Sequence, residues 1–151
     1  MRLTIEASLR RIVDLLRDEV GPEVQTPFLA QSVRMAGGLL TICANWVDDA
    51  AAIRVEENAA IRKVLAEASV SLDGDLSARL RAASLSSDPG LRISQLDAEN
   101  HRLRMLLVEA HGVAERGEGA SPQVLDAAIW RLLEEIELKR AQREQAHPYG
   151  Q

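Results

Sequence analysis

Aromatic residues are scarce in this chain: Phe, Trp and Tyr together make up 3% of its 151 residues. Aromatic and β-branched side chains favour strands, and no stretch alternates apolar and polar residues for long enough to form one. Ala and Leu, which are strong helix formers, are abundant instead. The composition therefore excludes a β-rich fold and predicts an all-α protein.

Cysteine is almost absent, since Cys43 is the single one. One thiol can form neither an internal disulfide nor a cysteine-based zinc site, so a reducing compartment is expected. Because Cys43 lies within the apolar stretch 39–47, we expect a buried and unreactive thiol. The first residues lack the apolar core of a secretory signal, and the sequence therefore predicts a cytoplasmic protein.

Basic residues are outnumbered by acidic ones: the chain has 18 Lys and Arg and 23 Asp and Glu, and its formal net charge is -5. A nucleic-acid-binding protein would carry a basic face, so nucleic acid is not expected as a partner. Long hydrophobic runs are missing as well: Gln31, Arg34 and Asn45 interrupt the most apolar segment, 28–47. We therefore expect no membrane partner.

Linkers rich in Gly and Pro, and internal repeats, are both missing, so the sequence predicts one helical-bundle domain over residues 1–151. Apolar residues at helical spacing indicate four long helical segments. These segments are 5–20, 28–69, 94–116 and the chain from 121 onward. Short connections between them predict an antiparallel bundle, with a fifth short helix around Leu80.

Proline and glycine mark the expected helix ends. Gly21-Pro22 is expected to end the first helix, and Thr26-Pro27 to cap and start the second. As one helix, segment 28–69 would be unusually long, so we expect a break in it. The two candidate positions are the glycine pair Gly37-Gly38 and the acidic pair Asp48-Asp49.

The most specific pattern is a coiled-coil seam in segment 94–116. Its 4-3-4-3-4 spacing is made by Leu96, Asn100, Leu103, Leu107, Ala110 and Ala114. A lone polar residue in a seam fixes the register at a cost in stability, so Asn100→Leu should raise stability. Two interpretations are open. In the first, the seam is the interface of a homodimer, formed by Leu96, Asn100, Leu103 and Leu107. In the second, the seam lies inside one chain, with Asn100 bonded to a neighbouring side chain.

A second pattern is a stripe of small and polar residues that includes Arg34, Asn45 and Asp48. If this face turned inward, Arg34 would bind an anionic group and Asn45 would orient it. Arg54 and Glu57 would line the same site one or two turns onward. The ligand would be phosphorylated or an acyl-CoA. The alternative is that the stripe is the solvated face of its helix.

Sequence motifs of enzymes are missing: the chain has no nucleophile elbow, no phosphate-binding glycine loop and no dinucleotide fingerprint. Glu99 and His101 are two residues apart, as are Glu109 and His111, and each pair therefore points to different helix faces. Among these four residues and Asp97, only Asp97 and His101 share a face, which is too few ligands for a metal. The sequence thus predicts no catalytic residue, no metal and no cofactor.

Three stretches carry a family resemblance: 20–24, Val33-Arg34-Met35-Ala36 within the segment from Phe28 to Trp46, and the closing His147-Pro148-Tyr149. They resemble a family of small uncharacterised bacterial all-helical proteins, a domain of unknown function. Its members are encoded near aminoglycoside-phosphotransferase-like and acyl-CoA-dehydrogenase-like enzymes. The resemblance implies a cytoplasmic accessory role and carries no site residues.

Together these observations favour a non-catalytic, self-associating helical bundle, a homodimer that is an accessory protein to a neighbouring metabolic enzyme. The alternative function is a small-molecule-binding bundle, or an enzyme that acts on an anionic ligand.

Overall fold

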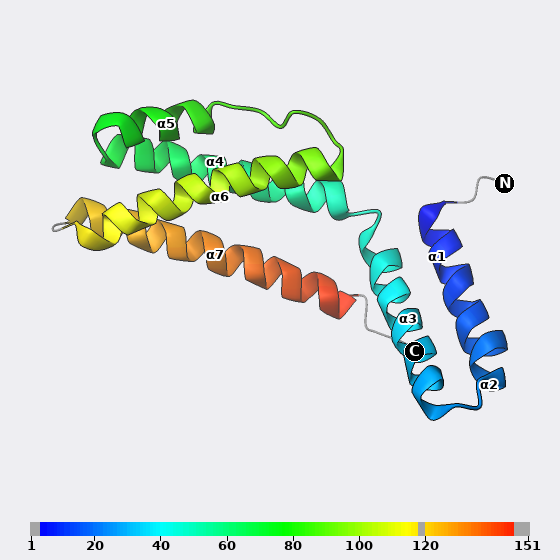
Figure 1. Cartoon of the computed structure of the whole chain (residues 1–151). Coiled ribbons are helices and arrows are strands. Elements are labelled where there is room, and N and C mark those ends of the chain that lie inside the picture. The colour runs from blue at the N-terminus through cyan, green and yellow to red at the C-terminus, as the bar shows by residue number, and fades with distance from the viewer. Residues whose placement is uncertain (1–3, 118–119, 147–151) are drawn as a thin grey trace. The chain divides into compact units, whose positions relative to one another are not determined.

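The computed structural model describes residues 4–117 and 120–146, which contain helices and no strand. The structure is 87% helical, so the predicted all-α class is confirmed. The elements are α1 (Ile5–Asp14), a π-helical turn η1 (Leu15–Val20), α2 (Gly21–Glu23), α3 (Pro27–Trp46), α4 (Ala50–Ser71), α5 (Gly74–Ser84), α6 (Ile93–Arg116) and α7 (Ala120–Ala146) (Figure 1). None of these helices combines the length and hydropathy that a membrane crossing requires.

The chain divides into two compact units. Unit 1 contains the described residues up to Ala50, together with the end of α7 from Arg143. Unit 2 spans Ala51–Gln142 and holds most of α4, all of α5 and α6, and most of α7. The expected single domain stays a prediction.

The first helix of unit 1 continues through Gly21-Pro22, where we expected it to end. In the π-turn the Gly21 N–H bonds to the Leu16 carbonyl, and a Cβ at Gly21 would stand 3.0 Å from that oxygen. Glycine therefore leaves room for the widened turn. Pro22 has no N–H to donate to the preceding turn, so the helical stretch continues through it with one backbone hydrogen bond fewer. The helical stretch ends at Glu23 instead.

The second expected helix starts at Pro27, as the Thr26-Pro27 pair predicts, although the Thr26 side chain makes no capping bond. It ends at Trp46, and a turn over 47–49 separates it from α4. The break in segment 28–69 thus falls at Asp48-Asp49, one of the two expected positions. The other, Gly37-Gly38, lies within unbroken helix.

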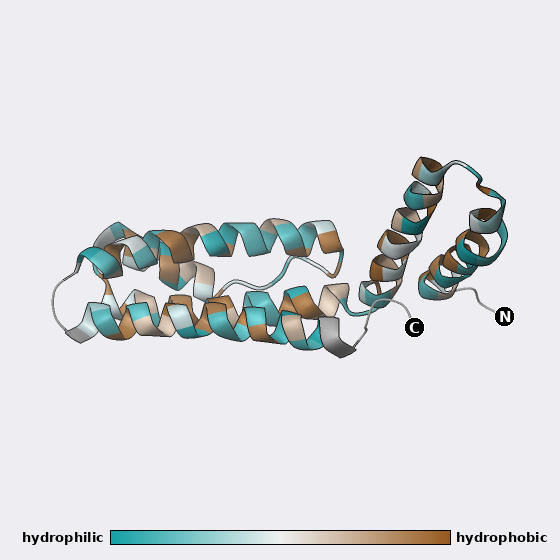
Figure 2. Ribbon diagram, turned by 90° about the horizontal axis from the view of Figure 1, so that it is seen from below, coloured by the Kyte–Doolittle hydropathy of each residue, from teal (hydrophilic) through white to brown (hydrophobic). Residues whose placement is uncertain are grey.

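Unit 1 is an antiparallel hairpin of α1 and α3 that buries very little (Figure 1). Ala44 is the one buried residue among the described helices of the hairpin. Hydrophobic residues recur along both helices (Figure 2), yet Ile5 is 67% exposed and Phe28 76% exposed. Cys43, expected to be buried, is exposed. The hairpin therefore lacks a core of its own.

In unit 2, α4 and α6 run in the same direction, because α5 and the stretch 85–92 return the chain to the start of α4 (Figure 1). The ion pairs Arg54–Asp97 and Arg62–Glu99 follow this parallel order. α7 runs opposite to both helices (Figure 1). The α4–α6 pair therefore departs from the antiparallel order that we expected.

The hydrophobic core of unit 2 draws on all four of its helices. Its fully buried members include Ile61 and Leu65 of α4, Leu80 of α5, Leu103 of α6 and Ile129 of α7. Burial of these aliphatic side chains is the main force that holds the helices together. The short helix expected around Leu80 is confirmed as α5.

Candidate functional site

Three polar residues are buried among the described residues of unit 2, and they lie together between α4 and α6. They are Glu57 and Asn58 of α4 and Asn100 of α6. Asn100 Nδ2 donates to Asn58 Oδ1 at 2.9 Å and to Glu57 Oε2 at 3.3 Å. Asn58 Nδ2 donates in turn to Asp88 Oδ1 at 2.9 Å. The two amides therefore have the partners that buried polar groups require.

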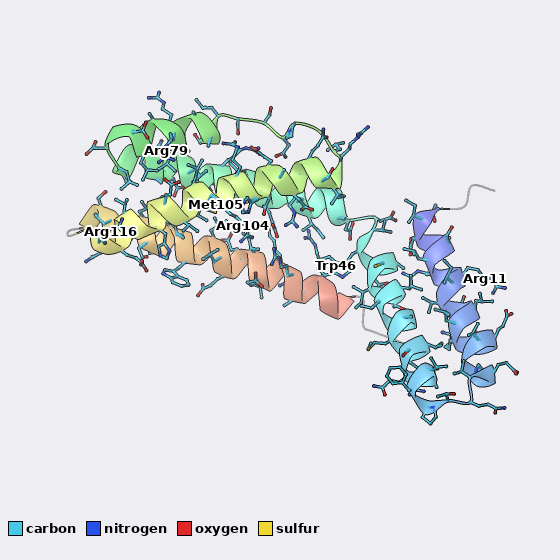
Figure 3. All side chains as sticks on the ribbon, viewed as in Figure 1. Arg11, Trp46, Arg79, Arg104, Met105 and Arg116 are labelled. Atoms are coloured by element: carbon cyan, nitrogen blue, oxygen red, sulfur yellow. The ribbon has the colours of Figure 1, made fainter. Side chains whose placement is uncertain are left out.

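Three arginines from three helices surround the carboxylate of Glu57. Arg54 Nη1 of α4 lies 2.7 Å from Oε2, and Arg140 Nη2 of α7 lies 2.9 Å from Oε1. Arg104 of α6 lies between α6 and α7 (Figure 3), with its Nη2 3.6 Å from Glu57 Oε2. Burial raises the pKa of Glu57, but the hydrogen bonds from Arg140 and Arg54 outweigh it and leave that pKa below its ordinary value.

A second ion cluster fastens the stretch after α5 to α4 and α6. Arg62 Nη2 lies 2.8 Å from both Asp88 Oδ1 and Glu99 Oε1. Glu99 also accepts from Arg102 at 2.7 Å and from Ser86 at 3.2 Å. The hydrogen bond from Arg102, joined by those from Arg62 and Ser86, outweighs burial and lowers the pKa of Glu99 to about 2.

Both clusters suit a structural role better than a chemical one. A general acid or base needs a pKa near the working pH, whereas Glu57 and Glu99 are both shifted downward. Buried charges that are fully paired hold helices in one register. The exception is Arg104 Nη2, the one buried side-chain nitrogen or oxygen without a hydrogen bond in the described part of the chain.

The seam residues of α6 are used within the chain. Leu96 and Leu103 are fully buried, Leu107 is 4% exposed and Asn100 is 6% exposed. Asn100 bonds to Asn58 and Glu57, as the intramolecular interpretation expects. A homodimer through these four residues would require unit 2 to open, and this interface stays a prediction.

Arg34, the centre of the expected anion site, is exposed on α3. It lies at a hollow of about 360 Å³ within unit 1. The other residues that line the hollow are Val13, Leu16, Arg17, Gly21, Pro22, Ala30, Val33 and Gly37. Arg17 is paired with Asp14 and Asp18, whereas no carboxylate of the described residues pairs with Arg34.

The other expected ligand residues do not line this hollow. Asn45 accepts a hydrogen bond from Arg10 Nη2 at 3.0 Å, and Asp48 is exposed in the turn after α3. Arg54 and Glu57 bond to each other in unit 2. The structure therefore does not gather Arg34 with these residues in the pocket of unit 1.

Sequence reasoning missed one group of possible metal ligands: His111 and Glu115 of α6 and Asp126 of α7. Their ligand atoms all lie within 4.8 Å of one another. Spacings within a single helix do not reveal this group, because Asp126 comes from the next helix. The available signal was the spacing of His111 and Glu115, which places both side chains on one face.

Comparison of the chain with protein-family models, with curated proteins and with solved structures gives no match. The family resemblance of the sequence therefore stays an expectation. Of the stretches that carry it, 147–149 lies outside the described residues.

Proposed function

We propose that this protein is a non-catalytic helical scaffold that associates with a second copy of itself through α3. One observation carries the proposal: α3 is apolar on two opposite faces, and unit 1 covers one of them. A helix that is apolar all round is normally buried all round.

The covered face of α3 packs on α1. Its members recur at helical spacing and are buried or half-buried: Val33, Gly37, Leu40 and Ala44. The opposite face, which we name the open seam, follows a 4-3-4-3-4 spacing through Phe28, Ser32, Met35, Leu39, Ile42 and Trp46. Phe28, Met35 and Leu39 are 76%, 65% and 60% exposed. This is the spacing of a coiled-coil seam, with large apolar side chains in water from Phe28 to Leu39, whereas Ile42 and Trp46 at its end are half-buried.

A second copy is the occupant that suits the open seam best. The seam contains no charged residue, so two copies meet without electrostatic repulsion. A charged partner would find no opposite charge in the seam to pair with. Arg34 is the single charged residue of α3, and it lies on another face. With 20 residues α3 is about 30 Å long, and two hairpins joined through it would make a four-helix bundle around a two-fold axis.

Light scattering coupled to size-exclusion chromatography tests this proposal. At micromolar concentration the wild-type protein should elute with twice the 16.6 kDa mass of one chain. Leu39→Glu, in the open seam, should give the single-chain mass. The matched control is Val70→Glu, which places the same charge at an exposed apolar residue of unit 2 and should leave the dimer intact. A monomeric wild type, or a dimeric Leu39→Glu variant, would overturn the proposal.

The family resemblance extends the proposal to an accessory role in the cytoplasm of a bacterium. The scaffold would support an aminoglycoside-phosphotransferase-like or acyl-CoA-dehydrogenase-like enzyme encoded beside it. Co-expression of the chain with that enzyme, followed by size-exclusion chromatography, should give a common peak. Separate elution of the two proteins at micromolar concentration would remove the accessory role.

A second candidate function is favoured by the hollow beside Arg34. An unpaired guanidinium at a mostly apolar hollow suits an anionic ligand with an apolar tail, such as an acyl-CoA. A long-chain acyl-CoA should then raise the melting temperature more than free coenzyme A does. Arg34→Gln should abolish the difference, and Arg11→Gln, at an exposed arginine of α1, should preserve it (Figure 3). Equal shifts for all three proteins would exclude this function.

A further inference from the structure

We propose that His111, Glu115 and Asp126 form a binding site for one divalent transition-metal ion, best matched by zinc, that links α6 to α7. All three residues belong to unit 2, so the inference is independent of self-association through α3.

The donor set suits zinc. Imidazole nitrogen and carboxylate oxygen are both common zinc ligands, and two carboxylates offset the charge of the ion. Three protein ligands leave the fourth tetrahedral position to water, as in sites that stay open to solvent. Glu115 is the most exposed of the three side chains at 60%, whereas that of Asp126 is 35% exposed and that of His111 is 20% exposed. An ion therefore has a path from solvent to the site.

The distances fit a single ion. Zinc–ligand bonds of about 2.0–2.1 Å place two donors of a tetrahedron roughly 3.3 Å apart. His111 Nε2 lies 2.8 Å from Asp126 Oδ1 and 3.7 Å from Glu115 Oε1, so the observed separations lie on either side of that value. The Glu115 and Asp126 oxygens lie within 4.8 Å of each other, so binding of one ion draws the three ligand atoms closer together.

The backbone that carries these ligands is held by the core of unit 2. Ala110 and Ala114 are buried next to the two α6 ligands, and Leu125 is buried next to Asp126. The edge of the His111 ring meets Trp130, with the ring centroids 5.5 Å apart and the planes at 85°. Ligands on rigid, packed elements bind an ion with little loss of conformational freedom.

Without an ion, His111 and Asp126 share a hydrogen bond across the two helices. A metal at Nε2 takes the place of that proton, and the neutral ring then keeps its hydrogen on Nδ1. The competing explanation is therefore a helix–helix hydrogen bond with no metal. Titration with zinc distinguishes the two, because only a metal site gives a stoichiometric complex.

The test is a zinc titration of the metal-stripped full-length chain by isothermal calorimetry. A Cys43→Ser background removes the exposed thiol, because cysteine is itself a common zinc ligand. We expect one ion per chain, with affinity at least about tenfold lower in His111→Ala and in Asp126→Asn. His101→Ala, at an exposed histidine of the same helix, and His147→Ala should bind as the background protein does.

A second readout guards against a folding defect. In a Trp46→Phe background, Co²⁺ at the site should quench the fluorescence of Trp130, which touches His111. Asp126→Asn keeps the size and hydrogen-bonding capacity of the side chain, and it should abolish the quenching with an unchanged circular dichroism spectrum. The inference fails if zinc binds without stoichiometry, or if His111→Ala and Asp126→Asn bind zinc as tightly as the background protein.

Discussion

Asn58 and Asn100, 42 residues apart in the chain, share an amide–amide hydrogen bond of 2.9 Å inside unit 2. Asn58 also donates to Asp88, and Asn100 also donates to Glu57. Amides that are buried and satisfied in this way allow only one register of α4 against α6.

The first prediction concerns that amide pair. Asn100→Leu leaves the buried Asn58 Oδ1 without its donor and should lower the free energy of unfolding by about 1–3 kcal/mol. The seam pattern alone predicts the opposite sign. Urea denaturation measures the change, and Met105→Leu, on the exposed side of α6, is the control that should change little. An Asn100→Leu variant as stable as wild type would contradict this account of the pair.

The second prediction concerns the carboxylate of Glu57. Glu57→Gln removes the negative charge that the half-exposed Arg54 and Arg140 share, although Arg54 keeps Asp97 and Arg140 keeps Glu137 as partners. Because hydrogen bonds to charged groups contribute more than neutral ones, we expect a loss of about 1.5–3 kcal/mol in the free energy of unfolding. Glu67→Gln, at an exposed acid of the same helix, should leave stability within about 0.5 kcal/mol of wild type. Similar stabilities of the two variants would show that the cluster contributes little.

The third prediction is a pH dependence that arises from Glu99. Its pKa in the folded chain, about 2, lies below the ordinary value of 4.5. The unfolded chain therefore takes up a proton first as the pH falls, so the stabilisation is complete above about pH 4.5 and is lost toward pH 2. The shift corresponds to at most roughly 3 kcal/mol, because solvent screens the half-exposed Arg102.

Denaturation curves at a series of pH values measure this loss. Glu99→Gln should flatten the dependence between pH 4.5 and 2, whereas Glu134→Gln, at an exposed acid of α7, should keep it. The downward pKa shift of Glu57 acts in the same direction, so some dependence should remain in Glu99→Gln. Parallel curves for wild type and Glu99→Gln would argue against the role of Glu99.

The fourth prediction compares two glycines. A Cβ at Gly117 would stand 2.7 Å from Pro122 Cγ, and a proline ring cannot swing aside, so Gly117→Ala should destabilise unit 2. A Cβ at Gly38 of α3 would meet nothing within 4 Å, and Gly38→Ala should stabilise the helix by about 1 kcal/mol. Thermal unfolding followed by circular dichroism measures both changes in stability. The prediction fails if the two variants are both stabilised or both destabilised.

The fifth prediction concerns amide exchange. Unit 1 buries too little to protect its amides alone, so peptides from α3 should exchange fast at nanomolar concentration and slowly at high concentration, where copies associate. Peptides from α6 should exchange at the same rate at both concentrations, because the core of unit 2 lies within one chain. Hydrogen exchange with mass spectrometry measures the difference. Concentration-independent exchange in α3 would conflict with the dimer.

The helices could be predicted because their signals are local. The Thr26-Pro27 pair predicted the start of α3, and the predicted segment 94–116 ends at Arg116, as α6 does. The prediction that the first helix ends at Gly21-Pro22 was wrong, because a π-turn depends on backbone geometry that the composition does not show. The prediction that Cys43 is buried was also wrong, because an apolar stretch is buried only where another helix or chain covers it.

The candidate sites depend on contacts between helices, which a spacing rule within one helix does not detect. Glu57 and Asn58 follow each other in a helix with many charges, and only the parallel course of α6 brings Asn100 to them. Asp126 reaches His111 across the α6–α7 pair for the same reason. The seam in α6 was visible in the sequence, but the choice between a partner chain and α4 required the direction of the helices.

The π-turn at Leu15–Val20 has a consequence for the phase of the first helix. A helical residue advances the chain by about 100° around the axis, and the turn holds one residue more than an α-helical path would. It therefore rotates the stripe before the turn relative to the stripe after it. A deletion of one residue at this point would straighten the path and rotate the half-buried Leu9 and Val13 around the axis, away from their present direction relative to α3. Related chains that pair the same two helices should accordingly keep the length of this stretch more strictly than its composition.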